Sequence, residues 1–288
     1  MSHPLQEFYD EMMKALGVEG LEIPLTAVTF FQEGQAIPES VLAHGVTDLT
    51  LTACQASRQA SLGDAVCLTR ENMGCVAGAI SLGMVAKDDP QPFSGPRVYT
   101  DLMKIQSADQ DTFAPPAPKD FTDGIVYACR DAGRPDFCLF GPEDSGRYQD
   151  IQTAGRAVEA MARISPPMVR AVFFYSLTFE EERIKPDVIL LSVRPVELTR
   201  LLQGHQFITG RPTLASMGGL RAVCSDLIAY VHVNQTLNIS PYCLGARLIA
   251  RYEAQRVGLG IPYGVFQVMI EGLKKSRTGY PFHRYPGV

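Results

Sequence analysis

Four cysteines are the residues of this chain whose types and positions favour chemistry. Cys54 lies in TACQASRQASLG, Cys75 in NMGCVAGAISLG, Cys224 in AVCSDLIAYV and Cys243 in SPYCLGAR. Four thiolates are the usual ligand set of a [4Fe–4S] or [2Fe–2S] cluster, and they also make a closed tetrahedral zinc site. The sequence contains no CxxC pair. A shared metal site would therefore require the tertiary structure to bring the four thiols together.

The four cysteines occur in two similar stretches of sequence. The first stretch contains, in order, AVTFF, a cysteine-containing helix, DAVCLT and GCVAGA. The second contains, in the same order, DVILL, RAVCSDLIAYVHV, QTLNI and YCLGAR. Matching residues have similar offsets, namely 160 positions for Val28 and Val188, 170 for Cys54 and Cys224, and 168 for Cys75 and Cys243. We expect an internal duplication in which equivalent cysteines face each other across a pseudo-twofold axis. The alternative is the general likeness of α/β units.

Together these motifs resemble the DUF169 family of uncharacterised bacterial and archaeal proteins. The motifs are AVTFFQEG, TACQASRQASLGDAV, NMGCVAGAISLGM, KPDVILLSVRP, AVCSDLIAYV, SPYCLGARLIARYE and GLGIPY. The resemblance runs from about Leu25 to Leu273 and implies no particular reaction, because the family has no settled activity to transfer. By position, it implies that the family's recurrent cysteines are the four above, and that Cys67, Cys129 and Cys138 are incidental.

The elements that must position the cysteines follow an α/β pattern. Helical spacing of apolar residues predicts an N-terminal helix, and apolar runs predict strands at 27–31, 64–69, 124–130, 136–141, 171–177 and 187–193. Later helices are expected at about 148–164, 195–204, 218–232, 241–256 and 263–275. We expect a mixed sheet flanked by helices and made of two similar halves. The halves would be residues 1–120, with a Pro-rich connection, and 121–288, or they would form one intertwined domain.

Residues beside the cysteines are candidates for substrate binding. Arg70 and Asn72 precede Cys75, and Arg247 follows Cys243, so these side chains could hold a small anionic substrate. Solvated positions without a partner are the alternative. Glycines shortly after Cys75 and Cys243 would let the backbone approach a cluster closely and point N–H groups at its sulfur.

Composition excludes several classes of function. The net charge is −5 with scattered basic residues, which argues against a nucleic-acid partner. No apolar run is long enough to span a bilayer, and the N-terminus has the pattern of an amphipathic helix and not of a signal peptide. Seven cysteines, an odd number, favour reduced thiols and a cytoplasmic location. Neither a P-loop nor a G-x-G-x-x-G or H-E-x-x-H motif occurs.

Three functional hypotheses follow from these observations. The preferred one is a cytoplasmic protein with one iron–sulfur cluster, [4Fe–4S], bound by the four cysteines between the halves, acting with a redox partner or on a small substrate. The second is a metal-free small-molecule-binding protein in which the cysteines only pack. The third is a thiol enzyme using Cys75, for which His44, His205 and His232 are the candidate bases.

Overall fold

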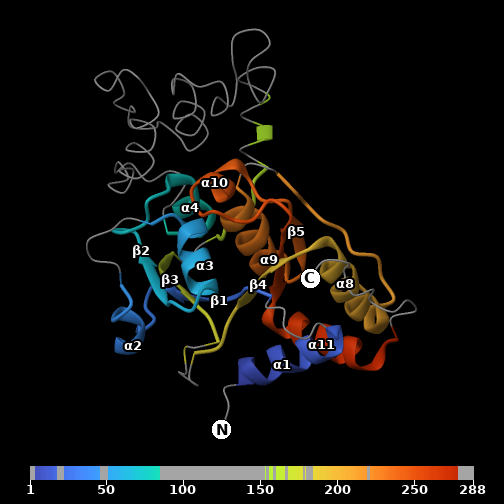
Figure 1. Ribbon diagram of the computed structural model, residues 1–288. Helices are drawn as coiled ribbons and strands as arrows, with labels where there is room; N and C mark the ends of the chain where they lie inside the picture. The colour runs from blue at the N-terminus through green and yellow to red at the C-terminus, as the bar shows by residue number, and fades with distance from the viewer. Residues whose placement is uncertain are drawn as a thin grey trace.

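The computed structural model of the protein describes most of the chain outside one long central segment (Figure 1). The described residues are 4–17, 23–45, 51–84, 153, 156–157, 160–165, 168–177, 179, 184–218 and 221–277. The predicted strands 124–130 and 136–141, most of the predicted helix 148–164, Cys129 and Cys138 lie outside them.

The described strands form a single six-stranded sheet with the order β2-β3-β1-β4-β6-β5. Their bounds are β1 Leu25–Gln32, β2 Val66–Thr69, β3 Val169–Tyr175, β4 Val188–Val193, β5 Asn238–Ser240 and β6 Val257–Pro262. Every pairing between these strands is antiparallel. The α/β class is confirmed, but the prediction of a mixed sheet is wrong for this part of the chain. Apolar runs indicate buried strands and carry no information on strand direction.

The strand order reads the same from both edges when β1, β2 and β3 are matched with β4, β5 and β6. β1 and β4 pair at the centre, and there Val28 lies opposite Val188. These are the two residues whose sequence contexts match. The central pairing therefore brings one residue from each of the two stretches into register.

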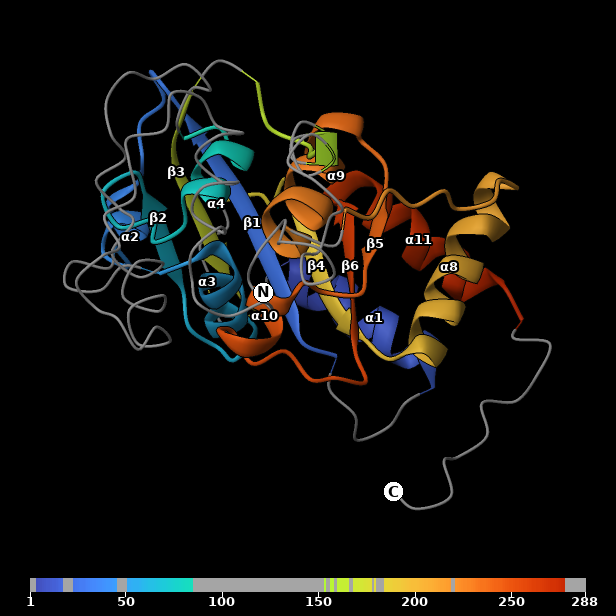
Figure 2. The ribbon, with the colours of Figure 1, turned by 90° about the horizontal axis from the view of Figure 1, so that it is seen from above.

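Helices cover both faces of the sheet (Figures 1 and 2). One face packs against α3 Ala53–Ser61, α4 Val76–Ser81, the π-helix η1 Ala222–Ala229, α9 Tyr230–Asn234 and α10 Leu244–Leu248. We call it the cysteine face. The opposite face packs against α1 Pro4–Leu16, α8 Pro195–Thr209 and α11 Tyr263–Lys275. A short helix, α2 Glu39–Leu42, lies near β2.

The two cores explain why the central strands carry mostly apolar residues on both faces. Val28 and Phe30 of β1 pack in the cysteine face, whereas Leu25 and Ala27 pack in the opposite face. Successive side chains of a strand point to opposite faces, so a strand covered on both sides needs apolar residues on each of its faces. This is the reason for the apolar runs in the sequence.

Strand β6 is absent from the predicted elements because its sequence, VGLGIP, contains two glycines that weaken a strand pattern. A Cβ atom on Gly258 would overlap the Leu227 side chain, and one on Gly260 would overlap the Leu227 main-chain oxygen. The glycines thus let η1, which carries Cys224, lie directly against the sheet.

The helices agree with prediction on the opposite face and differ from it on the cysteine face. α1, α8 and α11 lie where helical periodicity places them. The predicted helix 218–232 is a π-helix followed by α9, and the predicted helix 241–256 is only α10, which ends at Leu248. The chain leaves helical geometry there, and Arg251 has a positive φ of 60°. No helix among the described residues has both the length and the apolar character to cross a membrane.

Candidate functional site

The four cysteines enter the cysteine face from four different helices. Cys54 is the second residue of α3, and Cys224 is the third residue of η1. Cys75 and Cys243 directly precede α4 and α10 and occupy their N-cap positions. All except Cys54, which is partly exposed, are buried, and all five described cysteines are free thiols. Cys75 and Cys243 thus both occupy N-cap positions, and Cys54 and Cys224 both lie in the first turn of a helix.

The four cysteines pack in one core, with Cys75, Cys224 and Cys243 among its buried residues and Cys54 packed against it. The pKa of Cys54 is raised first by its hydrogen bond with Cys243, then by burial and by the charges of Cys243, Cys224 and Cys75. The pKa of Cys224 is raised mainly by burial and further by Cys75 and Cys243. Like charges disfavour each other's ionised form most strongly at short range in a dry core. We call these four residues the cysteine group.

Main-chain groups lie near two of the sulfur atoms. The Gly78 N–H donates to Cys75 Sγ over 3.4 Å, and the main-chain groups of Ala222 and Ala246 lie close enough to Cys243 to lower the pKa of its thiol. Gly78 and Ala246 each lie three residues after the nearby cysteine. The pKa of Cys243 is lowered first by the hydrogen bond from Cys54 and then, against the effect of burial, by these main-chain groups. N–H donors such as that of Gly78 stabilise thiolates and the sulfur atoms of clusters.

Arg221 is a residue of the site that the sequence reasoning missed. It directly precedes η1, and its positive charge lowers the pKa of both Cys224 and Cys243. The signal in the sequence was a basic residue three positions before a cysteine, in RAVC. Its importance becomes visible only when the π-helix places it near two thiols that are far apart in sequence.

Asp226 is a buried carboxylate in the same π-helix. It accepts hydrogen bonds from the Gly218 N–H over 3.4 Å and from the Ser240 hydroxyl over 3.2 Å. The Asn238 side chain also donates to the Asp226 main-chain oxygen over 2.9 Å. These contacts fix η1 to β5. π-helical turns of this kind are rare and are often found at functional sites.

Two of the three predicted substrate-binding residues, Asn72 and Arg247, bond to main-chain groups. Asn72 accepts from the Thr69 N–H over 2.7 Å and donates to the Cys67 carbonyl over 3.1 Å, which closes the turn after β2. Arg70 lies in that turn and is partly buried. Arg247 donates to the main-chain oxygens of Pro241, Tyr252, Glu253 and Arg256. Their role toward a substrate remains a prediction.

The three histidines that were candidate bases have other surroundings. The His232 ring lies 4.6 Å from the Phe30 ring, and the His44 ring lies 6.0 Å from the Phe173 ring. His205 belongs to α8, on the opposite face. The thiol-enzyme hypothesis expects one of these histidines in contact with Cys75. None of the described ring contacts joins a histidine to Cys75.

A single-ion site, such as a zinc site, and an iron–sulfur cluster make different demands on the described side chains. No three His, Cys, Asp or Glu side chains within the described ranges are placed to hold one metal ion. A structural zinc site needs its four ligands around a single centre, whereas a cluster distributes its thiolates over separate iron atoms. The thiols form one electrostatic group, and they are not arranged as a ready-made site for a single ion.

Comparison with known proteins gives a family and no closer relative. The model of the DUF169 family, described as "Uncharacterised ArCR", matches residues 18–272, a range that contains all four cysteines and the whole sheet. No curated protein and no solved structure matches the chain.

Proposed function

This chain belongs to the DUF169 family, and we propose that it binds one iron–sulfur cluster, [4Fe–4S], through Cys54, Cys75, Cys224 and Cys243. The observation that carries the proposal is that the four cysteines, at the starts of four separate helices, pack in one core on the same face of the sheet. Hydrogen bonding from Cys54, nearby main-chain groups and the charge of Arg221 lower the pKa of Cys243 and favour its thiolate, whereas the pKa values of Cys54 and Cys224 are raised. Thiolate is the form that ligates iron.

We propose that the binding site arose by internal duplication. If Val28 is equivalent to Val188, their partners Phe174 in β3 and Pro262 in β6 are equivalent too. Two residues earlier in these strands lie Val172 and Gly260. Val172 pairs with Leu68 of β2, and Gly260 pairs with Asn238 of β5, so Leu68 and Asn238 are equivalent as well. Leu68 and Asn238 are 170 positions apart, the same offset as Cys54 and Cys224. Strand register and cysteine spacing therefore support one alignment of the halves.

The duplication sets the place of the cluster. Cys54 and Cys75 belong to the half built around β1, β2 and β3, and Cys224 and Cys243 to the half built around β4, β5 and β6. The cluster would lie between them, near the pseudo-twofold axis. The division between halves that this proposal needs falls between β3 and β4, later in the chain than residue 120.

The cluster would transfer electrons with a redox partner or act as a Lewis acid on a small substrate. We also propose a cytoplasmic location, because thiolate ligands must stay reduced and the five described cysteines are free.

The test is anaerobic purification and reconstitution with iron and sulfide. We expect a brown protein with about four iron and four sulfide per chain. Cys54→Ser, Cys75→Ser, Cys224→Ser and Cys243→Ser should each lower the iron content strongly. Cys67→Ser is the matched control, because Cys67 is equally buried but packs on the opposite face. A colourless wild-type protein that is folded by circular dichroism would overturn the proposal.

A second candidate function is thiol–disulfide exchange, which the hydrogen bond between Cys54 and Cys243 favours. A dithiol in contact can reduce a disulfide substrate: both thiols lose a proton and together two electrons, and the substrate becomes two thiols. A colourless protein in which a disulfide reagent links Cys54 to Cys243, found by mass spectrometry, would support this candidate over the cluster.

A further inference from the structure

Several arginines lie together at the end of the sheet where β4 ends and β6 begins. The guanidinium of Arg58, in α3, pairs with Glu253 over 2.8 Å. Arg247 donates to the main-chain oxygens of Glu253 and Arg256. Arg251 lies between these residues in the sequence and is exposed. The segment that follows α10 thus brings its arginines to the place where Arg58 leaves α3.

The same group of charges continues to the start of α8. Arg256 pairs with Glu197 over 3.8 Å, and Arg194 pairs with the same carboxylate over 2.6 Å. Arg256 directly precedes β6 and Arg194 directly follows β4, and these two strands are paired. We call the five residues the arginine strip: Arg58, Arg194, Arg247, Arg251 and Arg256.

The arginine strip is a positive region on a chain that is negative as a whole. The net charge of the chain is −5, whereas the acids that pair with the strip are only Glu197 and Glu253 among the described residues. Glu197 is buried, and the exposed Asp64 after α3 still leaves the strip with more cations than anions. Charges of one sign that gather on a surface attract a partner of the opposite sign and speed its association.

Exposed apolar side chains flank the strip. Leu62 lies one helical turn after Arg58 and is 69% exposed, and Leu248 follows Arg247 and is 49% exposed. Apolar groups rimmed by polar residues are typical of protein–protein contact surfaces, in which arginine is enriched. A nucleic acid would need many cations along its phosphates, and Glu253 interrupts the strip. The surface therefore fits an acidic protein better than a nucleic acid.

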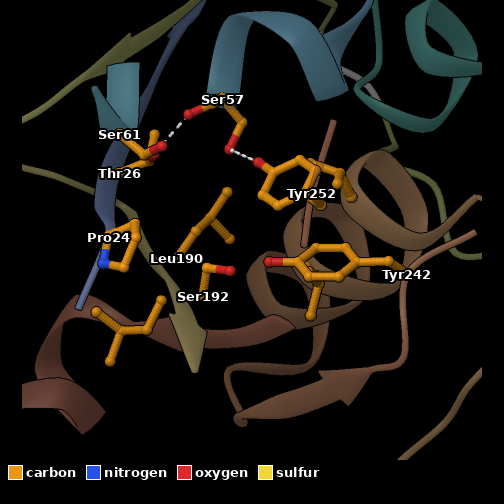
Figure 3. A pocket seen from close by; sticks show the side chains of 11 residues that line it. Pro24, Thr26, Ser57, Ser61, Leu190, Ser192, Tyr242 and Tyr252 are labelled. Atoms are coloured by element: carbon orange, nitrogen blue, oxygen red, sulfur yellow. Dashed lines mark hydrogen bonds between the residues drawn. The ribbon is translucent and has the colours of Figure 1, made fainter. Parts of the chain in front are cut away.

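Two buried tyrosines lie behind the strip (Figure 3). The rings of Tyr242 and Tyr252 stack with their centroids 4.2 Å apart. The Arg247 guanidinium lies 5.1 Å from the centre of the Tyr242 ring, and the Arg58 guanidinium lies 5.8 Å from that of Tyr252. The Tyr242 backbone has a φ of 66°, which is unfavourable for a bulky residue, so the surrounding structure holds this residue in place. Each ring thus contacts one arginine of the strip.

The same tyrosines adjoin the cysteine group. Tyr242 directly precedes Cys243, and the Tyr252 hydroxyl donates over 2.9 Å to Ser57, one helical turn after Cys54. Burial raises the pKa of Tyr252 most, and Tyr242 and Cys54 raise it further. The stacked tyrosines therefore lie between the arginine strip and the cysteine group.

The space beside the tyrosines admits no substrate. Ser192, Tyr242 and Tyr252 help to line a pocket there of about 10 Å³, which is room for about one water molecule (Figure 3). A small molecule has no path to the cysteine group through this pocket, whereas an electron needs no open channel.

We propose that the arginine strip docks an acidic electron-carrier protein, which exchanges one electron with the cluster past Tyr242 and Tyr252. One electron leaves the reduced carrier and lowers the charge of the cluster by one, and no bond forms or breaks. That the electron reaches a cluster rests on the proposed function; that an acidic protein docks on the strip does not.

The test measures the association of an acidic plant-type [2Fe–2S] ferredoxin with the whole chain, before and after reconstitution with iron and sulfide. The Debye length is about 30 Å at about 0.01 M salt and about 10 Å at about 0.1 M, so association should be about tenfold slower at the higher salt. At the lower salt, Arg251→Glu should slow association about fivefold or more, and Arg251→Lys should keep it within about twofold of the wild type. Electron exchange with the reconstituted cluster, followed by stopped flow, should show the same order.

Arg211→Glu is the matched control, because Arg211 is exposed and follows the far end of α8 from Arg194. It makes the same change of charge and should alter association less than about twofold, and thermal unfolding checks that each variant is folded. No binding at the lower salt, equal effects of Arg251→Glu and Arg211→Glu, or tighter binding of a short single-stranded DNA would overturn the proposal. So would docking on a reconstituted protein without electron exchange in either direction. Salt-sensitive docking on a colourless protein would uphold the surface while the cluster proposal fails.

Discussion

The two faces of the sheet are covered by different kinds of helix. The opposite face packs against the long regular helices α1, α8 and α11, whose buried residues are mostly large and aliphatic. The cysteine face packs against shorter helices, one of them a π-helix, and holds four thiols, the pocket and the strained Tyr242. The opposite face is thus built from long regular helices, whereas the residues of the proposed cluster site all lie on the cysteine face.

Charged groups show the same contrast. On the opposite face, the buried carboxylate of Glu197 accepts from the Arg194 N–H over 2.8 Å and pairs with Arg194 and Arg256. These contacts close the start of α8 and satisfy a buried charge. On the cysteine face, the charge of Arg221 acts on the thiols of Cys224 and Cys243. The charges around Glu197 stabilise the start of α8, whereas the charge of Arg221 lowers the pKa of two thiols.

The largest expected effect comes from filling the close contacts made by glycines on each face. A Cβ at Gly272 would overlap the Gly204 main chain where α11 meets α8, and one at Gly260 would overlap the Leu227 main-chain oxygen in η1. Gly272→Ala and Gly260→Ala should each lower the free energy of unfolding by about 3 kcal/mol or more, since main chain must move. Only Gly260→Ala should also lower the iron content, because it displaces the helix of Cys224.

Gly264→Ala is the control for these variants, because nothing lies within 4 Å of the added methyl group and it shares α11 with Gly272. It should leave stability unchanged or raise it by up to about 1 kcal/mol. Denaturant unfolding measures all three variants. If Gly272→Ala lowered the iron content as much as Gly260→Ala, the assignment of the cluster to the cysteine face would be wrong.

A smaller effect should come from Cys67, the cysteine among the described residues that packs on the opposite face. Burial alone raises the pKa of Cys67 to about 11, whereas the pKa values of Cys54, Cys224 and Cys243 are also shifted by neighbouring thiols. The folded protein holds this proton more tightly than the unfolded chain. The resulting stability is full below about pH 9 and is lost as the pH rises to about 11, a fall of about 3 kcal/mol.

Comparison with Cys67→Ala isolates this contribution. The variant lacks the thiol, so the difference in unfolding free energy between wild type and variant should shrink by about that amount over the same pH range. Urea unfolding at pH 8, 9 and 10.5 measures it. A difference that stays constant with pH would show that Cys67 does not titrate as a buried thiol.

The smallest effect concerns the start of α3. Thr52 accepts from the Gln55 N–H over 3.2 Å, and its own N–H donates to Gln55 Oε1 over 3.0 Å, which makes a capping box. Thr52→Ala should cost about 1 kcal/mol and loosen the turn that holds Cys54, so iron should be lost faster to a chelator. Thr199→Ala, an exposed threonine in α8, should change neither quantity. Equal iron loss in both variants would contradict this expectation.

Sequence patterns predicted the opposite face better than the cysteine face. The regular spacing of Leu5, Met12 and Leu16 predicts α1, and helical periodicity similarly predicts α8 and α11. On the cysteine face, β6 was missed and the helix expected over 241–256 is a single short α10. Glycines and positive φ values there serve close approach between η1, β6 and Tyr242, and such contacts leave no periodic signal.

The sequence by itself determined the α/β class and the family, because these depend on local patterns and on motifs along the chain. Only the tertiary structure decided the antiparallel direction of the described strands, the contact between Cys54 and Cys243, and the place of Arg221. It also made the pocket, whose Ser192 and Tyr242 come from separate segments. Charge effects and hydrogen bonds act over a few ångströms, and that proximity exists only after the chain has folded.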